Sequence, residues 1–169
     1  MTSDRSADAT RSPHSGAPAQ PPHDVSLVQE FDLHSLYALR AAVAAHAVTL
    51  GLPEERLGTI TLIATELATN AIRHGAGTGR LRLWRSDQTV HLQVSDDGPG
   101  MAQPESAGLR PAPLSSPGGR GLWIVRKISD RMNIAANHGT TVTVCLDIED
   151  VSLDPQPTDI ERKIPQTDS

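Results

Sequence analysis

Residues 60–74 read ITLIATELATNAIRH, and the apolar side chains of this stretch recur every three or four positions. Such a period predicts an amphipathic helix with one buried face. Pro53 suits the first turn of this helix, and the pattern continues as far as His74. The residues expected to end the helix are Gly75, Gly77 and Gly79.

Two polar side chains lie at the edge of this apolar face. Glu66 and Asn70 are four residues apart, which places them on the same side of the helix, about 5–6 Å apart at Cβ. A carboxylate beside a neutral oxygen ligand suits a site for a magnesium nucleotide, because Mg²⁺ keeps several waters and takes only one or two protein oxygens. Taken alone, however, the pair is more typical of a solvated helix flank.

The neighbouring sequence predicts further strands and helices. Residues 26–31 can form a strand, and residues 36–50 have a helical apolar period. After the glycines, apolar and polar residues alternate over 81–83 and 90–94, which predicts an antiparallel hairpin that turns at residues 86–88.

The last part of the chain predicts one more helix and two strands. The helix contains Leu122, Val125 and Ile128, and the strands span residues 133–136 and 141–148. We expect an α+β fold, a two-layer sandwich in which helices cover one face of a mixed, mostly antiparallel sheet. The other face of such a sheet would be partly open.

A second polar motif, Asp96-Asp97-Gly98-Pro99-Gly100, directly follows the strand that ends at Val94. Its glycines let the backbone approach a ligand that a Cβ would exclude. The Asp96 carboxylate could accept a hydrogen bond from an exocyclic amine such as that of adenine. An ordinary Asp-Gly turn at a strand end explains this motif equally well when it is taken alone.

A third motif, Gly118-Gly119-Arg120-Gly121-Leu122, lies at the start of the last helix. Free N–H groups and the dipole at a helix start favour phosphate, although a flexible loop before a helix would have a similar sequence. Residues 101–117 contain four prolines and predict a mobile loop of the kind that often forms a lid. The three motifs in this order are far less expected by chance than any one of them.

Composition excludes several classes of function. The formal net charge of -5 and the scarcity of aromatic residues argue against nucleic acid as a direct partner. Cys145 is the single cysteine, and the histidines lack ligand spacing, so a disulfide or a structural metal is not expected. No apolar run is long enough to cross a membrane, and we expect a soluble, cytoplasmic protein.

The two ends of the chain are rich in proline and polar residues and have no apolar period. We expect residues 1–24 to be a disordered leader and residues 152–169 a disordered tail. The folded domain is therefore predicted to span residues 25–151.

The three motifs resemble, in order and spacing, the N box and the two glycine boxes of GHKL ATPases, the superfamily of gyrase, heat-shock chaperones, histidine kinases and mismatch-repair proteins. The resemblance covers nearly all of residues 25–148. The stretches ELATNAIRH (66–74) and GRGLWIV (119–125) resemble the branch of bacterial anti-sigma factors with serine kinase activity. This resemblance implies the GHKL ATPase fold, with ATP and Mg²⁺ as cofactors.

The resemblance also implies roles for individual residues. Glu66 matches the general base that acts on the attacking hydroxyl or water, Asn70 matches the Mg²⁺ ligand, and Asp96 matches the carboxylate that reads adenine. Further matching positions are Gly98 and Gly100 in the turn of Asp96, Gly119, Gly121 and Leu122 in the phosphate-proximal box, and Thr140, a strand threonine that supports adenine recognition.

Two functions of different classes follow from this resemblance. In the first, the chain holds a sigma factor and phosphorylates an anti-anti-sigma antagonist protein on serine or threonine. In the second, it is a non-catalytic ATP-binding module whose nucleotide stabilises a lid that a partner recognises. Glu66 favours the first, because nucleotide binding alone does not need a carboxylate base. A histidine kinase core fits less well, because residues 1–24 could not supply its dimerising helices, and a homodimer is compatible with either function.

Overall fold

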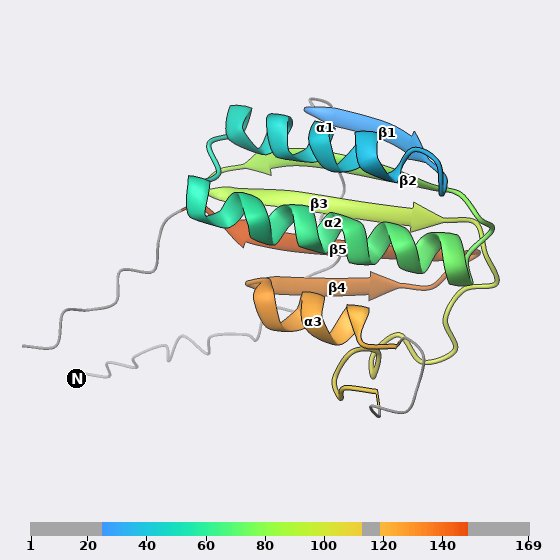
Figure 1. Cartoon of the computed structure of the whole chain (residues 1–169). Helices are drawn as coiled ribbons and strands as arrows, with labels where there is room; N and C mark the ends of the chain where they lie inside the picture. Colours follow the sequence, from blue (N-terminus) through green and yellow to red (C-terminus); the bar gives the residue numbers. More distant parts are fainter. Residues whose placement is uncertain (1–24, 113–118, 149–169) are drawn as a thin grey trace, which may run out of the picture.

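The computed structural model describes residues 25–112 and 119–148. Within these ranges, Figure 1 shows eight elements in the order β1 (Leu27–Phe31), α1 (Leu36–Thr49), α2 (Glu54–His74), β2 (Gly79–Ser86), β3 (Thr89–Asp96), α3 (Gly121–Ile128), β4 (Arg131–Ala135) and β5 (Thr140–Asp147). Each helix and strand expected from the sequence is present, with bounds that agree to within about three residues.

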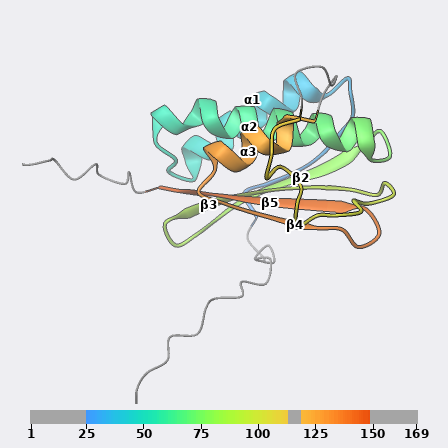
Figure 2. The same cartoon turned by 90° about the horizontal axis from the view of Figure 1, so that it is seen from below.

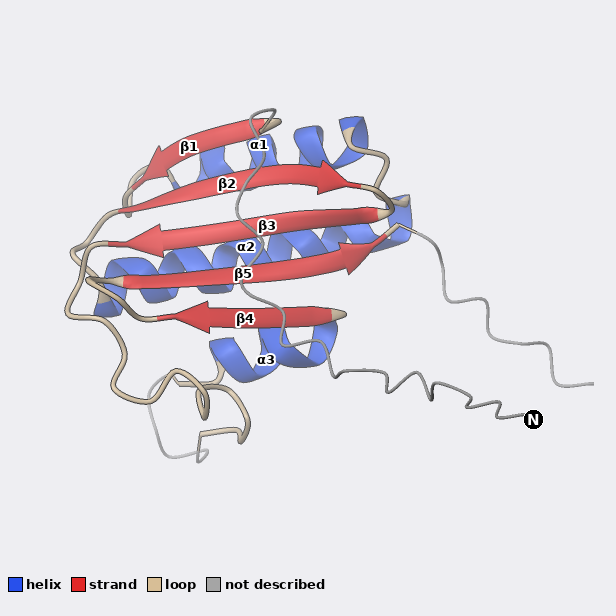
Figure 3. Cartoon of the chain, turned by 180° about the vertical axis from the view of Figure 1, so that it is seen from behind, coloured by secondary structure: helices blue, strands red, loops and turns tan. Residues whose placement is uncertain are grey.

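The strands form one sheet with the order β1-β2-β3-β5-β4 (Figure 3). The three helices cover one face of this sheet, as the view along the layers shows (Figure 2). The predicted α+β two-layer sandwich is therefore confirmed. All strand pairs among the described residues are antiparallel, so the sheet is not mixed.

The position of β5 explains why the sheet is antiparallel throughout. β3 and β4 run in the same direction and are connected through α3, which is the usual arrangement of a parallel pair. However, β5 lies between them and pairs antiparallel with both. A later strand thus occupies the place in which a parallel partner of β3 would lie.

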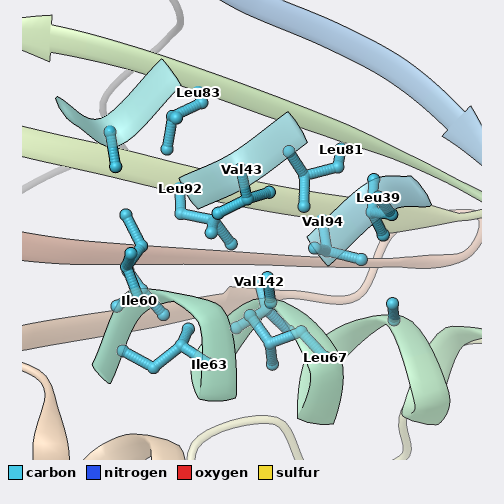
Figure 4. Close-up of a cluster of buried hydrophobic side chains, with 14 of the residues drawn as sticks. Leu39, Val43, Ile60, Ile63, Leu67, Leu81, Leu83, Leu92, Val94 and Val142 are labelled. Atoms are coloured by element: carbon cyan, nitrogen blue, oxygen red, sulfur yellow. The ribbon is translucent and has the colours of Figure 1, made fainter. Parts of the chain in front are cut away.

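The hydrophobic core lies between the helices and the sheet. Alternate residues of the central strands point toward the helices, and the register pairs Leu83 with Leu92 and Leu92 with Val144. Leu39 and Val43 of α1 pack with them into one cluster of buried side chains (Figure 4). From α2 the same cluster receives Ile60, Ile63, Leu67 and Ala71.

Helix α2 lies across the middle of the sheet, close to β3 and β5 (Figure 1). Its C-terminal end reaches the edge of the molecule where β3 ends, β5 begins and α3 begins. The three sequence motifs belong to these same ends. The topology therefore brings the motifs together, although they are separated along the chain.

Some sequence expectations fall on residues outside the described ranges. Gly118 and residues 113–117 of the expected lid are among them, as are residues 1–24 and 149–169. In the described part of the chain, no helix has the length and apolar character needed to span a membrane.

Candidate functional site

Glu66 and Asn70 project from α2 toward the first residue of α3. A Cβ placed on Gly121 would lie 2.6 Å from Oε2 of Glu66 and 3.3 Å from Nδ2 of Asn70. A Cβ at that position would displace the Glu66 carboxylate, so glycine at position 121 leaves room for this side chain beside the start of α3. Both side chains are partly exposed, and both line an open hollow at the surface. Their oxygens are therefore available to a ligand.

Asp96 is the last residue of β3 and begins the second motif. The backbone N–H of Gly98 donates a hydrogen bond to its Oδ1 atom at 2.9 Å. In the sheet register Asp96 is paired with Thr140, the first residue of β5. The carboxylate and the threonine, to which the resemblance gives a role in adenine recognition, therefore lie on adjacent strand ends.

One cavity of about 210 Å³ connects the three motifs. Six of the expected site residues line it, namely Asn70, Asp96, Gly119, Gly121, Leu122 and Thr140. The remaining lining is largely apolar and comes from α2, β3, β5 and the residue after Gly100: Leu67, Ala71, His74, Val94, Met101 and Val142. An apolar chamber with a carboxylate at one end suits a flat heteroaromatic base with an exocyclic amine.

A second hollow of about 310 Å³ adjoins this cavity, because both are lined by Asn70, Gly119 and Gly121. It adds Glu66, Arg73 and Arg120, so it is polar and carries charges of both signs. In the combined site, the part next to Asp96 has mostly apolar walls, and the part next to Glu66 has charged walls. A nucleoside phosphate has the same division between its base and its phosphates.

The start of α3 supplies the wall between the two hollows. Gly119 has a left-handed backbone with φ of +83°, and the first helical hydrogen bond of α3 runs from the N–H of Ile124 to the carbonyl of Arg120. The N–H groups of the first turn are therefore not used within the helix and can bind an anion. This position fits the phosphate-binding role that the resemblance gave to Gly119 and Gly121.

Gly98 and Gly100 do not line the cavity. They act on the shape of the turn, since Gly98 donates its N–H to Asp96 and Gly100 has φ of +78°. A Cβ on Gly100 would lie 3.3 Å from the carbonyl oxygen of Gly139. The turn after β3 and the turn before β5 are thus packed against each other.

The residues present fit a magnesium nucleotide. The site offers an amide and a carboxylate on adjacent turns of α2, and glycine where a Cβ would fill the space in front of them. Among residues 25–112 and 119–148 no cluster of three or more His, Cys, Asp or Glu side chains could hold a metal by itself. A metal at Asn70 would therefore complete its coordination with phosphate oxygens and water, which is the usual arrangement for Mg²⁺.

The described part of the expected lid lies against α3. The side chain of Arg126 donates a hydrogen bond to the carbonyl of Ala107 at 3.0 Å. Gly108 has φ of +72°, and a Cβ there would lie 2.7 Å from the carbonyl oxygen of Leu122. Residues 101–112 contain no helix or strand, in agreement with the loop expected from the prolines.

Sequence reasoning missed several residues that line the site. Met101 and Val142 contribute to the apolar walls, and Arg73 contributes a cation at the charged end. The helical period contained a signal for Arg73, because it lies two turns after Glu66 on nearly the same side. The helical period alone did not decide whether His74 lies in the site, and the structure puts this histidine in the lining of the cavity.

A larger, open hollow of about 600 Å³ lies on the other side of Asp96. Its lining is polar and includes Glu30, Asp32, Asp97 and Arg80. Of the residues expected in the site, only Asp96 borders it. The arrangement of the three motifs therefore assigns the smaller cavity, rather than this one, to the ligand.

Comparison with known proteins agrees with this geometry. Residues 30–146 match the histidine kinase-like ATPase domain. The chain is 32% identical over 114 residues to the anti-sigma F factor of Anoxybacillus flavithermus, an alignment that covers 61% of this chain and 77% of that protein. An anti-sigma F factor of a Geobacillus strain matches with the same identity and the same coverage.

Among solved structures, the histidine kinase domain of the blue-light activated kinase of Erythrobacter litoralis is similar, with 22% identity and a TM-score of 0.49. That likeness covers 65% of this chain and 61% of the solved chain, so it spans about three fifths of that protein's length. The family match extends over most of the described residues and includes all three motifs. The chain therefore belongs to the family of histidine kinase-like ATPase domains.

Proposed function

We propose that this protein binds ATP with Mg²⁺ and acts as a bacterial anti-sigma regulatory factor with serine/threonine kinase activity. In this proposal it sequesters a sigma factor and phosphorylates the antagonist that would release it. The observation that carries the proposal is the position of Gly121 beside both Glu66 and Asn70, in the lining of a cavity that Asp96 also lines. The names of the two anti-sigma F factors at 32% identity support the choice of partners, and we propose the cytoplasm as the place where such partners would be bound.

The residues of the site divide the work of phosphoryl transfer. Bound Mg-ATP would supply the transferable phosphoryl group and a metal charge that offsets the charge of the phosphates. Asp96 and Thr140 orient the base, and the first turn of α3 holds the phosphate end with its free N–H groups. Asn70 offers its amide oxygen to the metal, one helical turn from Glu66. Positioning and charge stabilisation of this kind provide most of the catalysis in phosphoryl transfer.

Glu66 is placed to act on the acceptor. It lines the polar hollow and not the apolar cavity, so its carboxylate lies on the side from which an incoming hydroxyl can reach the phosphate end. There it would accept the proton of the serine or threonine hydroxyl as the oxygen attacks phosphorus. Arg73 borders the same hollow and would favour an acceptor segment with acidic residues.

Glu66→Gln tests the catalytic part of the proposal. The substitution keeps the shape of the side chain but removes the base, so we expect phosphoryl transfer to slow by about 10² to 10⁴-fold while ATP binding remains. Asn70→Ala should instead weaken binding of Mg-ATP itself, because the metal loses a ligand. The assay uses labelled ATP and candidate antagonist proteins, followed by mapping of the phosphorylated residue.

Glu55→Gln is the matched control, since it makes the same change in the exposed first turn of α2. It should leave transfer unchanged. If the wild type binds ATP and a sigma factor but labels no antagonist, and Glu66→Gln binds sigma like the wild type, the kinase activity is refuted. The protein would then act as the non-catalytic ATP-binding module.

A further inference from the structure

The turn that carries Asp96 is packed directly against the end of helix α2. A Cβ on Gly75, the residue that ends α2, would lie 2.7 Å from both Cγ and Oδ1 of Asp96. A Cβ on Gly98 would in turn overlap the Cα atom of Gly75. Real Cβ atoms do not approach other atoms this closely, so a side chain at either position would force a neighbouring group to move.

A left-handed backbone is not the reason why position 75 is a glycine. Its φ is -89°, outside the left-handed region that favours glycine. Its backbone N–H donates a hydrogen bond to the carbonyl of Ala71 at 2.9 Å, which closes the last turn of the helix. What excludes a side chain is the space taken by this carbonyl and by the Asp96 carboxylate.

The same helix carries the polar groups of the charged end. Glu66 and Asn70 lie about two turns and one turn, respectively, before the end of α2, and Gly75 lies at its end against Asp96. An α-helix is stiff and rises about 1.5 Å per residue. Helix α2 thus sets the distance between two parts of the site. One part is Glu66 and Asn70, which are assigned to the phosphate end and the metal. The other part is the Asp96 carboxylate, which is assigned to the nucleobase.

We infer that Gly75 is a positioning residue for nucleobase selection, which acts by seating the Asp96 carboxylate against the end of α2. This inference rests on the proposed function, because it names what determines the base specificity of that site. A side chain at position 75 pushes the carboxylate out of line with an exocyclic amine. The site then loses its preference for a base with an amine donor at this position over one with a carbonyl, as in ATP over GTP.

Gly75→Ala is the direct test, with calorimetric binding of ATP and GTP as the measurement. Loss of an aligned, charge-assisted hydrogen bond should weaken ATP by roughly ten- to hundredfold and leave GTP nearly unchanged. Gly77→Ala is the control in the same loop, because a Cβ there meets nothing within 4 Å although its φ is +82°. It reports strain in the loop without contact to Asp96, and should leave the ATP to GTP ratio as in the wild type.

A double-mutant cycle separates positioning from general damage to the fold. If Gly75 acts through Asp96, Gly75→Ala should have little further effect on ATP binding once Asp96→Asn has been made. An equal effect in both backgrounds overturns the inference, as does wild-type ATP affinity in Gly75→Ala.

The carboxyl ¹³C signal of Asp96 in the nucleotide-free protein provides an independent readout. It should shift in Gly75→Ala and stay in place in Gly77→Ala. If it shifts while the wild type itself binds no ATP, the proposed function fails and the contact between Gly75 and Asp96 stands. If ATP binds normally and the signal does not shift, the inference about Gly75 fails alone.

Discussion

At the scale of single residues, we propose that recognition of the nucleobase depends on Asp96. Its carboxylate accepts the N–H of Gly98 and faces the apolar cavity, so one of its oxygens is held while the other is available to a ligand. We expect Asp96→Asn to weaken ATP binding by about 1.5–3 kcal/mol, the usual loss for a hydrogen bond to a charged group. Calorimetry measures this change directly. Asp97→Asn is the control, because Asp97 borders the other hollow, and equal affinities of the Asp96 variant and the wild type would refute the assignment.

His91 is the residue from which we expect a pH effect on stability near neutrality. Its ring stacks on Trp84 with centroids 5.0 Å apart, and its Nε2 and the hydroxyl of Ser86 share a hydrogen bond of 2.7 Å. Burial lowers the pKa of His91 below its usual 6.5, and the charge of Arg131 lowers it further, against an opposing effect of Asp147. The folded protein therefore disfavours the protonated imidazole.

The sign of the effect follows from proton binding. Between the lowered pKa and 6.5 the unfolded chain binds more protons at this position than the folded chain, so stability falls as the pH falls through this range. We expect the Tm to decrease between pH 7 and pH 5.5, and the slope to be smaller in His91→Gln. His34→Gln, at an exposed position, should keep the wild-type slope.

The two ion-paired carboxylates Asp130 and Asp147 do not produce the same signal in this window. Asp130 and Asp147 have pKa values below the usual 3.8 because of hydrogen bonds from Arg56 and Arg131, respectively. Their stabilisation is complete above that value and is lost only in stronger acid. An unchanged slope in His91→Gln between pH 7 and pH 5.5 would therefore refute the role given to His91.

At the scale of elements, hydrogen bonds connect the start of α2 to the residue before β4 and to the last residue of β5. The guanidinium of Arg56 donates to Oδ2 and Oδ1 of Asp130 at 2.7 and 3.2 Å, and also to the carbonyl of Asp147 at 2.7 Å. Asp130 in turn accepts the backbone N–H of Asp147. This bidentate, partly buried ion pair attaches one end of α2 to the sheet. It is the end of the helix that lies away from the candidate site.

We expect Arg56→Ala to lower the free energy of unfolding by about 1–2 kcal/mol, since a bidentate pair that is partly shielded from water is worth more than an exposed one. Urea unfolding measures the change. Arg80→Ala removes the more exposed pair with Glu30 and should have little measurable effect. Equal stabilities of the two variants would show that the Arg56 pair contributes no more than a surface contact.

At the scale of the whole molecule, the described residues form one hydrophobic core. The buried cluster takes side chains from β1, α1, α2, β2, β3, α3 and β5, all of which lie between residues 25 and 148. The sequence outside this range lacks an apolar period that could repay the entropy of ordering. We therefore expect a chain trimmed to residues 25–151 to keep the Tm of the full chain. A fall of many degrees on trimming would show that one of the ends packs on the folded domain.

Local sequence determined the elements of this protein and the order of its motifs. The helical period of residues 60–74 and the alternation of residues 81–94 depend on neighbours along the chain, so they could be recognised without any knowledge of tertiary contacts. The glycines at 98, 100, 119 and 121 were recognised in the same way, because glycine next to a strand end or a helix start has a local signature. Their assignment to one nucleotide site came from the resemblance to GHKL ATPases.

Tertiary structure decided which of these features meet. The place of β5 between β3 and β4 makes the sheet antiparallel throughout and pairs Asp96 with Thr140, and no local pattern contains strand order. Gly75 appeared in the sequence only as the end of a helix, and its contact with Asp96 exists because α2 crosses the sheet above the end of β3. Such contacts arise from packing between segments far apart in the chain, where the shape of both partners determines the fit and neither sequence alone records it.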